Sequence, residues 1–177
     1  MKTIKVGMIG FGTIGVGVAK ILTQNCEIIK KRLGAELKLV KVADLDITTD
    51  RGIELAPNVL TTSADDVINH PDIDICIELI GGYEPARTFL LQAISQGKHI
   101  VTANKALLAK HGDEIFSAVA QKCLSIGFEA SIGGAIPIVR SVREAFVANR
   151  IQSLEGIVNG TANYILSKMS DENCDFD

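Results

Sequence analysis

The sequence predicts an α/β fold with a doubly wound, mostly parallel sheet. Short apolar strands alternate with helices of about a dozen residues or more, which is typical of strands joined by helical crossovers. A Gly-x-Gly-x-x-Gly turn joins the first strand to the first helix. The alternation is interrupted at Gly133–Pro137. We therefore expect a Rossmann-type domain over residues 1–135 and the beginning of a second, α+β domain over residues 136–177.

Apolar periodicity and chain breakers locate the elements of the first half. We expect a strand at Ile4–Ile9, a helix at Thr13–Leu33 that ends at Gly34, a strand at Leu37–Ala43 and a short helix at Asp65–Asn69 before Pro71. The first three form the strand–helix–strand unit that a parallel sheet requires.

The second half repeats this pattern up to the interruption. We expect strands at Ile73–Ile80, His99–Thr102 and Leu124–Ala130, and helices at Pro85–Ser95 and Lys105–Lys122. Beyond Pro137 we expect a helix at Ile138–Asn149 and a strand that starts within Ile151–Val158. Ligands of such a sheet bind at the carboxyl ends of its strands.

The three glycines of the first turn each have a physical reason to be glycine. Gly10 permits the tight turn, Gly12 lets a pyrophosphate approach the backbone, and Gly15 lets the helix pack closely on the strand. The free amides and the positive dipole end of the helix then face the phosphates. The turn predicts a dinucleotide site, and the alternative is an ordinary strand-to-helix turn without a ligand.

Composition excludes several other classes of protein. The 177 residues are 47% hydrophobic and 22% charged with a net charge of −3, so we expect a folded, soluble protein without a basic surface for nucleic acid. We see neither a secretion signal nor an apolar run long enough to span a membrane, and we therefore expect a cytoplasmic protein.

The four cysteines are far apart in the sequence and form no C-x-x-C pair, which indicates free thiols. Cys76 lies in an apolar run and is interpreted as a buried small hydrophobic residue. A catalytic cysteine is the less favoured alternative, because none lies at a strand end beside a base.

Asp44 follows the second strand and is the candidate for binding the two hydroxyls of the adenosine ribose. A carboxylate at this position repels a 2′-phosphate, which favours NAD over NADP. Two alternatives stay open at this point. Asp44 or Asp46 is a turn residue only, or Lys41 and Arg51 reach the site and change its preference.

Lys105 lies where a strand ends and a helix begins, at the edge of the sheet where chemistry is expected. A lysine acts as an acid or base near neutral pH when burial or nearby positive charge lowers its pKa, and the helix N-terminus supplies some of that charge. The alternative is a solvated surface lysine.

The segment Glu129–Pro137 places a carboxylate beside irregular backbone whose carbonyls suit a hard cation or a substrate. Equally, it is a glycine-permitted turn between domains that Glu129 caps. The three histidines, His70, His99 and His111, are scattered, so we expect no histidine metal cluster.

Five motifs taken together resemble homoserine dehydrogenase. They are Ile9–Gly15, Glu78–Gly82, Gly97–Ala109, Glu129–Ile138 and Gly156–Leu166. They occur in order over nearly the whole chain, and the string Val-Thr-Ala-Asn-Lys that ends at Lys105 is far more discriminating than the glycine turn. The resemblance implies NAD(P)-dependent interconversion of L-homoserine and L-aspartate 4-semialdehyde, a step in threonine and methionine biosynthesis, by an enzyme that is a homodimer.

The resemblance also implies roles for particular residues. Lys105 would be catalytic, helping to transfer the hydroxyl proton while hydride passes to the nicotinamide. A structural sodium ion would bind Glu129 and the backbone carbonyls of Ile132, Gly134 and Ile136. The cofactor would contact Gly10, Phe11, Gly12, Thr13, Ile14, Gly15, Asp44, Gly81, Thr102 and Lys105.

This sequence departs from the family pattern in length. Family members continue beyond the Asn-Gly-Thr segment at Asn159 with further substrate-binding and acid/base residues that are not present here. We therefore expect a cofactor-binding fragment that is inactive by itself. Two alternatives are a non-catalytic NAD-sensing module, which has no evident need for Lys105, and a related semialdehyde or amino-acid dehydrogenase. The lack of a strand-end cysteine argues against acyl chemistry in the latter.

Overall fold

The computed structural model describes residues 1–176. The chain divides into two compact units, Met1–Ala135 and Ile136–Asp177, which are described separately below.

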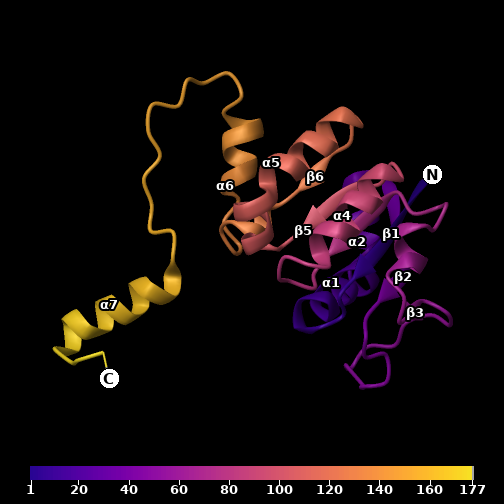
Figure 1. Cartoon of the computed structure of the whole chain (residues 1–177), viewed down its shortest axis with the longest axis horizontal. Coiled ribbons are helices and arrows are strands. Elements are labelled where there is room, and N and C mark those ends of the chain that lie inside the picture. Colours follow the sequence, from indigo (N-terminus) through magenta and orange to yellow (C-terminus); the bar gives the residue numbers. More distant parts are fainter. Residues whose placement is uncertain (177) are drawn as a thin grey trace. The chain divides into compact units, whose positions relative to one another are not determined.

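The first unit is built on a six-stranded sheet in the order β3-β2-β1-β4-β5-β6, in which every neighbouring pair is parallel (Figure 1). The strands are β1 (Lys2–Ile9), β2 (Ala35–Ala43), β3 (Leu60–Thr61), β4 (Ile75–Glu78), β5 (His99–Thr102) and β6 (Ile126–Gly127). This order confirms the predicted fold class. The strand order reverses between β1 and β4, and such a switch point leaves a crevice at the carboxyl ends of the two strands.

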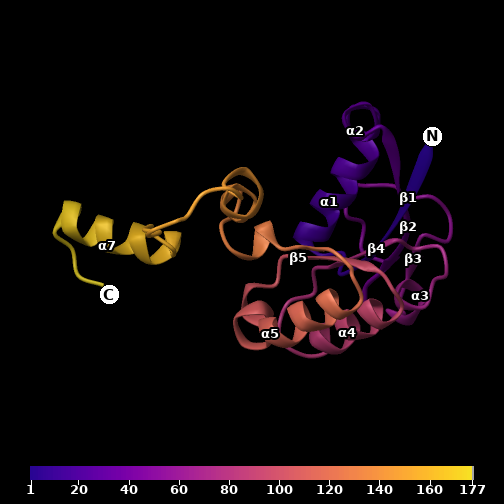
Figure 2. The ribbon, with the colours of Figure 1, turned by 90° about the horizontal axis from the view of Figure 1, so that it is seen from above.

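Helices cover both faces of this sheet. Figure 2 shows α1 (Thr13–Gln24) and α2 (Cys26–Leu33) on one face, with α3 (Asp65–Ile68), α4 (Ala86–Ser95) and α5 (Lys105–Gln121) on the other. The strands separate two hydrophobic cores, because successive residues of a strand point to opposite faces. In β1, Met8 packs in the core with Ala19 of α1, and Ile9 packs in the core with Leu90 of α4.

The prediction of one continuous helix at Thr13–Leu33 is wrong, because the structure has two helices there. The break lies at Asn25, whose φ of −103° and ψ of 15° are not helical and which both ends α1 and precedes α2. The Asn25 side chain makes no cap hydrogen bond to α2, and the Asn25 N–H donates to the Ile21 carbonyl at the end of α1. The predicted stop at Gly34 is confirmed, since Gly34 takes a left-handed conformation with φ 67° and its N–H donates to the Lys30 carbonyl.

Two strands are shorter than predicted and one was missed. β4 is confined to the four residues at which it pairs with both β1 and β5, and β6 to the two that pair with β5. Residues Glu129–Ser131 form a 3₁₀ helix, η1, instead of the end of a strand. β3 has only two residues, too few to show a periodic pattern in the sequence.

Within residues 136–176 the second unit contains three helical segments, α6 (Ile138–Arg140), the π-helical η2 (Ser141–Ala145) and α7 (Gly160–Glu172). The predicted helix at 138–149 therefore ends early. The strand predicted at 151–158 is also wrong, since residues 136–176 include no strand. A strand needs a neighbour with which to share hydrogen bonds, and an apolar segment alone does not provide one. None of the helices within residues 1–176 is long and apolar enough to cross a membrane.

Candidate functional site

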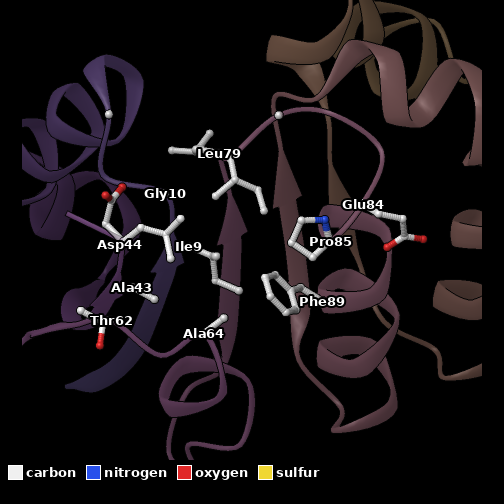
Figure 3. A pocket seen from close by; sticks show the side chains of 14 residues that line it. Ile9, Gly10, Ala43, Asp44, Thr62, Ala64, Leu79, Glu84, Pro85 and Phe89 are labelled. Atoms are coloured by element: carbon white, nitrogen blue, oxygen red, sulfur yellow. The ribbon is translucent and has the colours of Figure 1, made fainter. Parts of the chain in front are cut away.

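A cavity of about 570 Å³ lies at the carboxyl edge of the sheet, beside the ends of β1, β2 and β4. Figure 3 shows Gly10 and Asp44 on one side of it and Pro85 and Phe89 on the other. Its size is in the range of small-molecule sites. The residues that line it are Ile9, Gly10, Gly12, Ala43, Asp44, Leu45, Thr62, Ala64, Leu79, Ile80, Gly81, Glu84, Pro85 and Phe89.

Two glycines of the first turn are required by the fold itself. Gly10 has a φ of 104°, and a Cβ there would lie 2.7 Å from the carbonyl carbon of Leu79. A Cβ on Gly15 would overlap the carbonyl oxygen of Gly10. These two positions thus pack α1, the turn and the loop after β4 against one another without room for a side chain.

Gly12 is different, because nothing in the fold demands a glycine there. Its φ of −69° and ψ of −162° suit any residue, and a Cβ would meet no atom within 4 Å beyond its own neighbours in the chain. Gly12 lines the cavity, so its bare backbone faces open space. A ligand that comes close to the main chain is a reason for glycine at such a position.

The first turn of α1 offers amide groups beside Gly12. The helical hydrogen bonds begin with the N–H of Val16, which donates to the Gly12 carbonyl at 2.9 Å. The amides of Thr13, Ile14 and Gly15 precede this bond and have no acceptor within the helix. Together with the helix dipole they favour an anion such as a phosphate.

Asp44 is held rigidly against the glycine turn. One carboxylate oxygen accepts the Phe11 N–H at 2.5 Å, and the other accepts the Asp46 N–H at 2.9 Å. The second oxygen also lies 3.4 Å from the guanidinium of Arg51. Asp44 is therefore more than a turn residue, because its carboxylate links β2 to the turn and lines the cavity.

Of the two basic residues Lys41 and Arg51, it is Arg51 that reaches Asp44. Its guanidinium donates to the Phe11 carbonyl at 2.6 Å and lies over the Phe11 ring at 5.5 Å from the centroid. It also pairs with Asp46 at 3.3 Å. Lys41 instead donates to the carbonyl of Asn58 at 2.7 Å.

The net charge around Asp44 is therefore less negative than the two carboxylates of Asp44 and Asp46 alone suggest. Hydrogen bonds from Thr49 and Thr48 hold the pKa of Asp46 well below its usual range, so Asp46 is ionised. The single positive charge of Arg51 compensates part of the negative charge of Asp44 and Asp46.

Lys105 is the first residue of α5 and its side chain is exposed. The preceding residue, Asn104, caps the helix by accepting the Leu107 N–H at 3.1 Å. The side-chain amide of Asn104 donates to the Gly82 carbonyl at 2.7 Å. Lys105 therefore stands on a helix end that is tied to the loop containing Gly81, although Lys105 itself does not line the cavity.

Two further residues predicted to contact the cofactor, Phe11 and Thr102, are buried. Phe11 is 3% exposed, so it offers its ring to the core, while its N–H is used by Asp44. Thr102 is buried at the end of β5, and its hydroxyl donates to Glu78 at 2.7 Å. Of the predicted cofactor residues, Gly10, Gly12, Asp44 and Gly81 line the cavity together.

The segment predicted to bind sodium begins with η1. The hydroxyl of Ser131 donates to the Thr102 carbonyl at 2.8 Å and so ties this turn to the end of β5. Glu129, Ile132 and Gly134 belong to the first unit and Ile136 to the second. Within residues 1–176 no group of three or more His, Cys, Asp or Glu side chains is placed to hold a metal ion. Sodium binding through backbone carbonyls stays a prediction.

Sequence reasoning missed the cavity walls formed by Pro85 and Phe89, which only the fold brings opposite Asp44. It also did not single out Glu78, whose carboxylate is buried at the end of β4. The available signal was a charged residue at the end of an apolar strand. Cys76 was predicted correctly to be buried, and this burial raises the pKa of its thiol to about 12.

A parallel sheet in this order, with a glycine turn, a helix N-terminus and a cavity at the switch point, defines a dinucleotide-binding protein of the Rossmann class. Residues 10–129 match the family model described as "Homoserine dehydrogenase, NAD binding domain", and residues 137–177 match the model "Homoserine dehydrogenase". The chain belongs to the homoserine dehydrogenase family.

Similar proteins carry the same description. A homoserine dehydrogenase of Synechocystis sp. is 46% identical over 99% of this chain and 40% of its own length. That of Bacillus subtilis is 42% identical over 97% of this chain and 40% of its own length. This chain thus spans about 40% of the length of the curated relatives it matches.

Solved structures agree with the sequence relatives. A homoserine dehydrogenase from Thiobacillus denitrificans superposes with a TM-score of 0.90 at 49% identity, over 100% of this chain and 41% of that one. An S. aureus homoserine dehydrogenase crystallised at pH 7.5 has a TM-score of 0.79 at 32% identity, over 99% of this chain and 42% of that one.

Proposed function

We propose that this chain binds NAD(P) in the cavity and supplies the cofactor half of an enzyme that interconverts L-homoserine and L-aspartate 4-semialdehyde. The observation that carries the proposal is Gly12, a glycine that the fold does not need and whose bare backbone faces the cavity. The matched NAD-binding family model supports the same assignment.

The cofactor would lie across the glycine turn. Its pyrophosphate would face the backbone at Gly10 and Gly12 and the amides of Thr13, Ile14 and Gly15. Asp44, already fixed by the Phe11 N–H, would accept hydrogen bonds from the adenosine ribose. The apolar wall contributed by Ala64, Pro85 and Phe89 suits the adenine ring.

The nicotinamide end would point toward Gly81 and the end of β5. A bound nicotinamide would supply the hydride acceptor for the carbon that bears the substrate hydroxyl. Lys105, at the start of α5, would help to move the hydroxyl proton in the same reaction. Its helix end is fixed to the Gly81 loop through Asn104, which supports this placement.

We propose that NAD is preferred, because Asp44 would repel a 2′-phosphate. Arg51 moderates this preference by pairing with Asp44. The sodium ion at Glu129 and the homodimer are proposals that rest on the family resemblance. The cytoplasmic location is also a proposal. A non-catalytic sensor is less favoured, because a sensor does not need Lys105.

Calorimetric titration of the chain with NADH tests the first half of the proposal, and we expect one site per chain. Homoserine-dependent reduction of NAD⁺ by the complete protein that carries this sequence tests the second half. A chain that is folded by circular dichroism but binds neither NADH nor NADPH at millimolar concentration would refute the cofactor assignment.

A further inference from the structure

Glu78 is a fully buried carboxylate that the proposed reaction does not use. It is the last residue of β4 and is 0% exposed. β4 lies between β1 and β5, and Glu78 is in register with Ile9 on one side and Thr102 on the other. A buried charged side chain is costly unless its oxygens are hydrogen-bonded, so its partners indicate its role.

Three donors converge on this carboxylate, two from the loop after β4 and one from the end of β5. Oε1 accepts the N–H groups of Ile80 and Gly81, at 3.0 and 3.2 Å. Oε2 accepts the hydroxyl of Thr102 at 2.7 Å. Because all three partners donate, the position requires a group that accepts at both of its oxygens, as a carboxylate does.

The hydrogen bonds continue from Thr102 and return to the same loop. The Thr102 hydroxyl oxygen accepts the Asn104 N–H at 3.0 Å. Asn104 in turn donates to the Gly82 carbonyl at 2.7 Å and caps α5 through the Leu107 N–H. The bonds therefore form a closed ring that joins β4, the loop at residues 80–82, the end of β5 and the first turn of α5.

The same loop also supports the glycine turn. A Cβ on Gly10 would lie 2.7 Å from the carbonyl carbon of Leu79 and 3.0 Å from the nitrogen of Ile80, so the two backbones are in direct contact. A shift of the loop would be transmitted to the turn, because closely packed backbones leave no space to absorb it.

We propose that Glu78 is a positioning residue that fixes the loop at residues 80–82 and the start of α5 as one unit, and so sets Lys105 and the glycine turn relative to a shared cofactor. The inference rests on the proposed function. Glu78 would act on the cofactor site only through the N–H groups of Ile80 and Gly81 and through the hydroxyl of Thr102.

Lys98 provides a matched control for a purely structural effect. It is also buried, at 3% exposure, and its ammonium donates to the carbonyls of His70 and Ile73 at 2.6 and 3.1 Å. Lys98 precedes β5, so it lies at the opposite edge of the sheet from Glu78. Lys98→Met should lower stability while leaving the cofactor site unchanged.

The test is Glu78→Gln, which keeps the shape but places a donor where three donors already converge. We expect the Kd of the chain for NADH to rise about tenfold, because small displacements of positioned groups have effects of this order or larger. We also expect faster hydrogen exchange at the amides of Ile80, Gly81 and Leu107. Lys98→Met should change the Kd less than twofold.

Thr102→Val and Thr102→Ser test the same ring if Glu78→Gln does not fold. The valine removes the hydroxyl at nearly constant volume, and we expect the same rise in Kd and in exchange. The serine keeps the hydroxyl and should retain the wild-type values.

The proposal would be overturned by wild-type Kd and exchange rates in Glu78→Gln or Thr102→Val, or by an equal rise in Kd in Lys98→Met. Failure of the wild-type chain to bind NADH would instead refute the proposed function. The exchange measurement needs no cofactor and would still decide whether Glu78 holds the loop.

Discussion

Replacing Gly12 by alanine should separate cofactor binding from folding. The added methyl group meets no atom within 4 Å, and the backbone conformation is open to alanine. Replacing glycine at a compatible site stabilises by about 0.4–1 kcal/mol. Loss of glycine at the N-cap costs about 0.5–1 kcal/mol. These effects offset one another, so for a chain of 177 residues the Tm should change by less than about 4 °C.

The expected effect on the ligand is much larger. The methyl group would project into the cavity where the pyrophosphate approaches the backbone. We expect a loss of NADH affinity of about 100-fold, which corresponds to about 2.7 kcal/mol. Calorimetric titration gives the affinity, and thermal unfolding by circular dichroism gives the Tm of the same preparation.

Gly15→Ala is the matched control with the opposite expectation. Its methyl group would overlap the Gly10 carbonyl, and Gly10 is itself held against Leu79, so neither can move away. Overpacking of this kind costs about 3 kcal/mol, a fall in Tm of about 6–12 °C. Unchanged NADH affinity in folded Gly12→Ala would show that the open space at Gly12 is not the cofactor site, and unfolding of Gly12→Ala would refute the geometry.

Three further predictions concern cofactor choice, catalysis and pH. Asp44→Ser should shift the ratio of NAD to NADP affinity toward NADP by about tenfold, because it removes the carboxylate that would repel a 2′-phosphate and leaves Arg51 with one carboxylate partner, Asp46, in place of two; an unchanged ratio would assign the preference to other residues. Lys105→Ala should lower kcat of the complete protein about 100-fold, and near-normal turnover would rule out its role in proton transfer. Arg87 donates hydrogen bonds to Glu114 and so lowers the pKa of that carboxylate. The stability that this contact gives to the folded state is complete above the unfolded pKa of about 4.3 and is lost as the pH falls through the lower folded pKa. Arg87→Met should therefore make Tm less dependent on pH between about 5 and 3, and a Tm profile parallel to that of the wild type would contradict this.

Local patterns in the sequence predicted those features that have local causes. The glycine turn, the stop at Gly34 and the strand at His99–Thr102 depend on backbone conformation and on apolar residues that are close in sequence. Burial of Cys76 followed from its place in an apolar run. The break at Asn25 was missed because apolar periodicity continues on both sides of it.

The sequence by itself thus determined the fold class and the position of the glycine turn, because both follow from residue types at short spacing. Only the tertiary structure decided which strands are neighbours. By placing β4 between β1 and β5 it brought Glu78 to Thr102, and by closing the loop after β2 it brought Arg51 to Phe11, 40 residues earlier. These contacts join residues far apart in the chain and depend on strand order, which local periodicity does not encode.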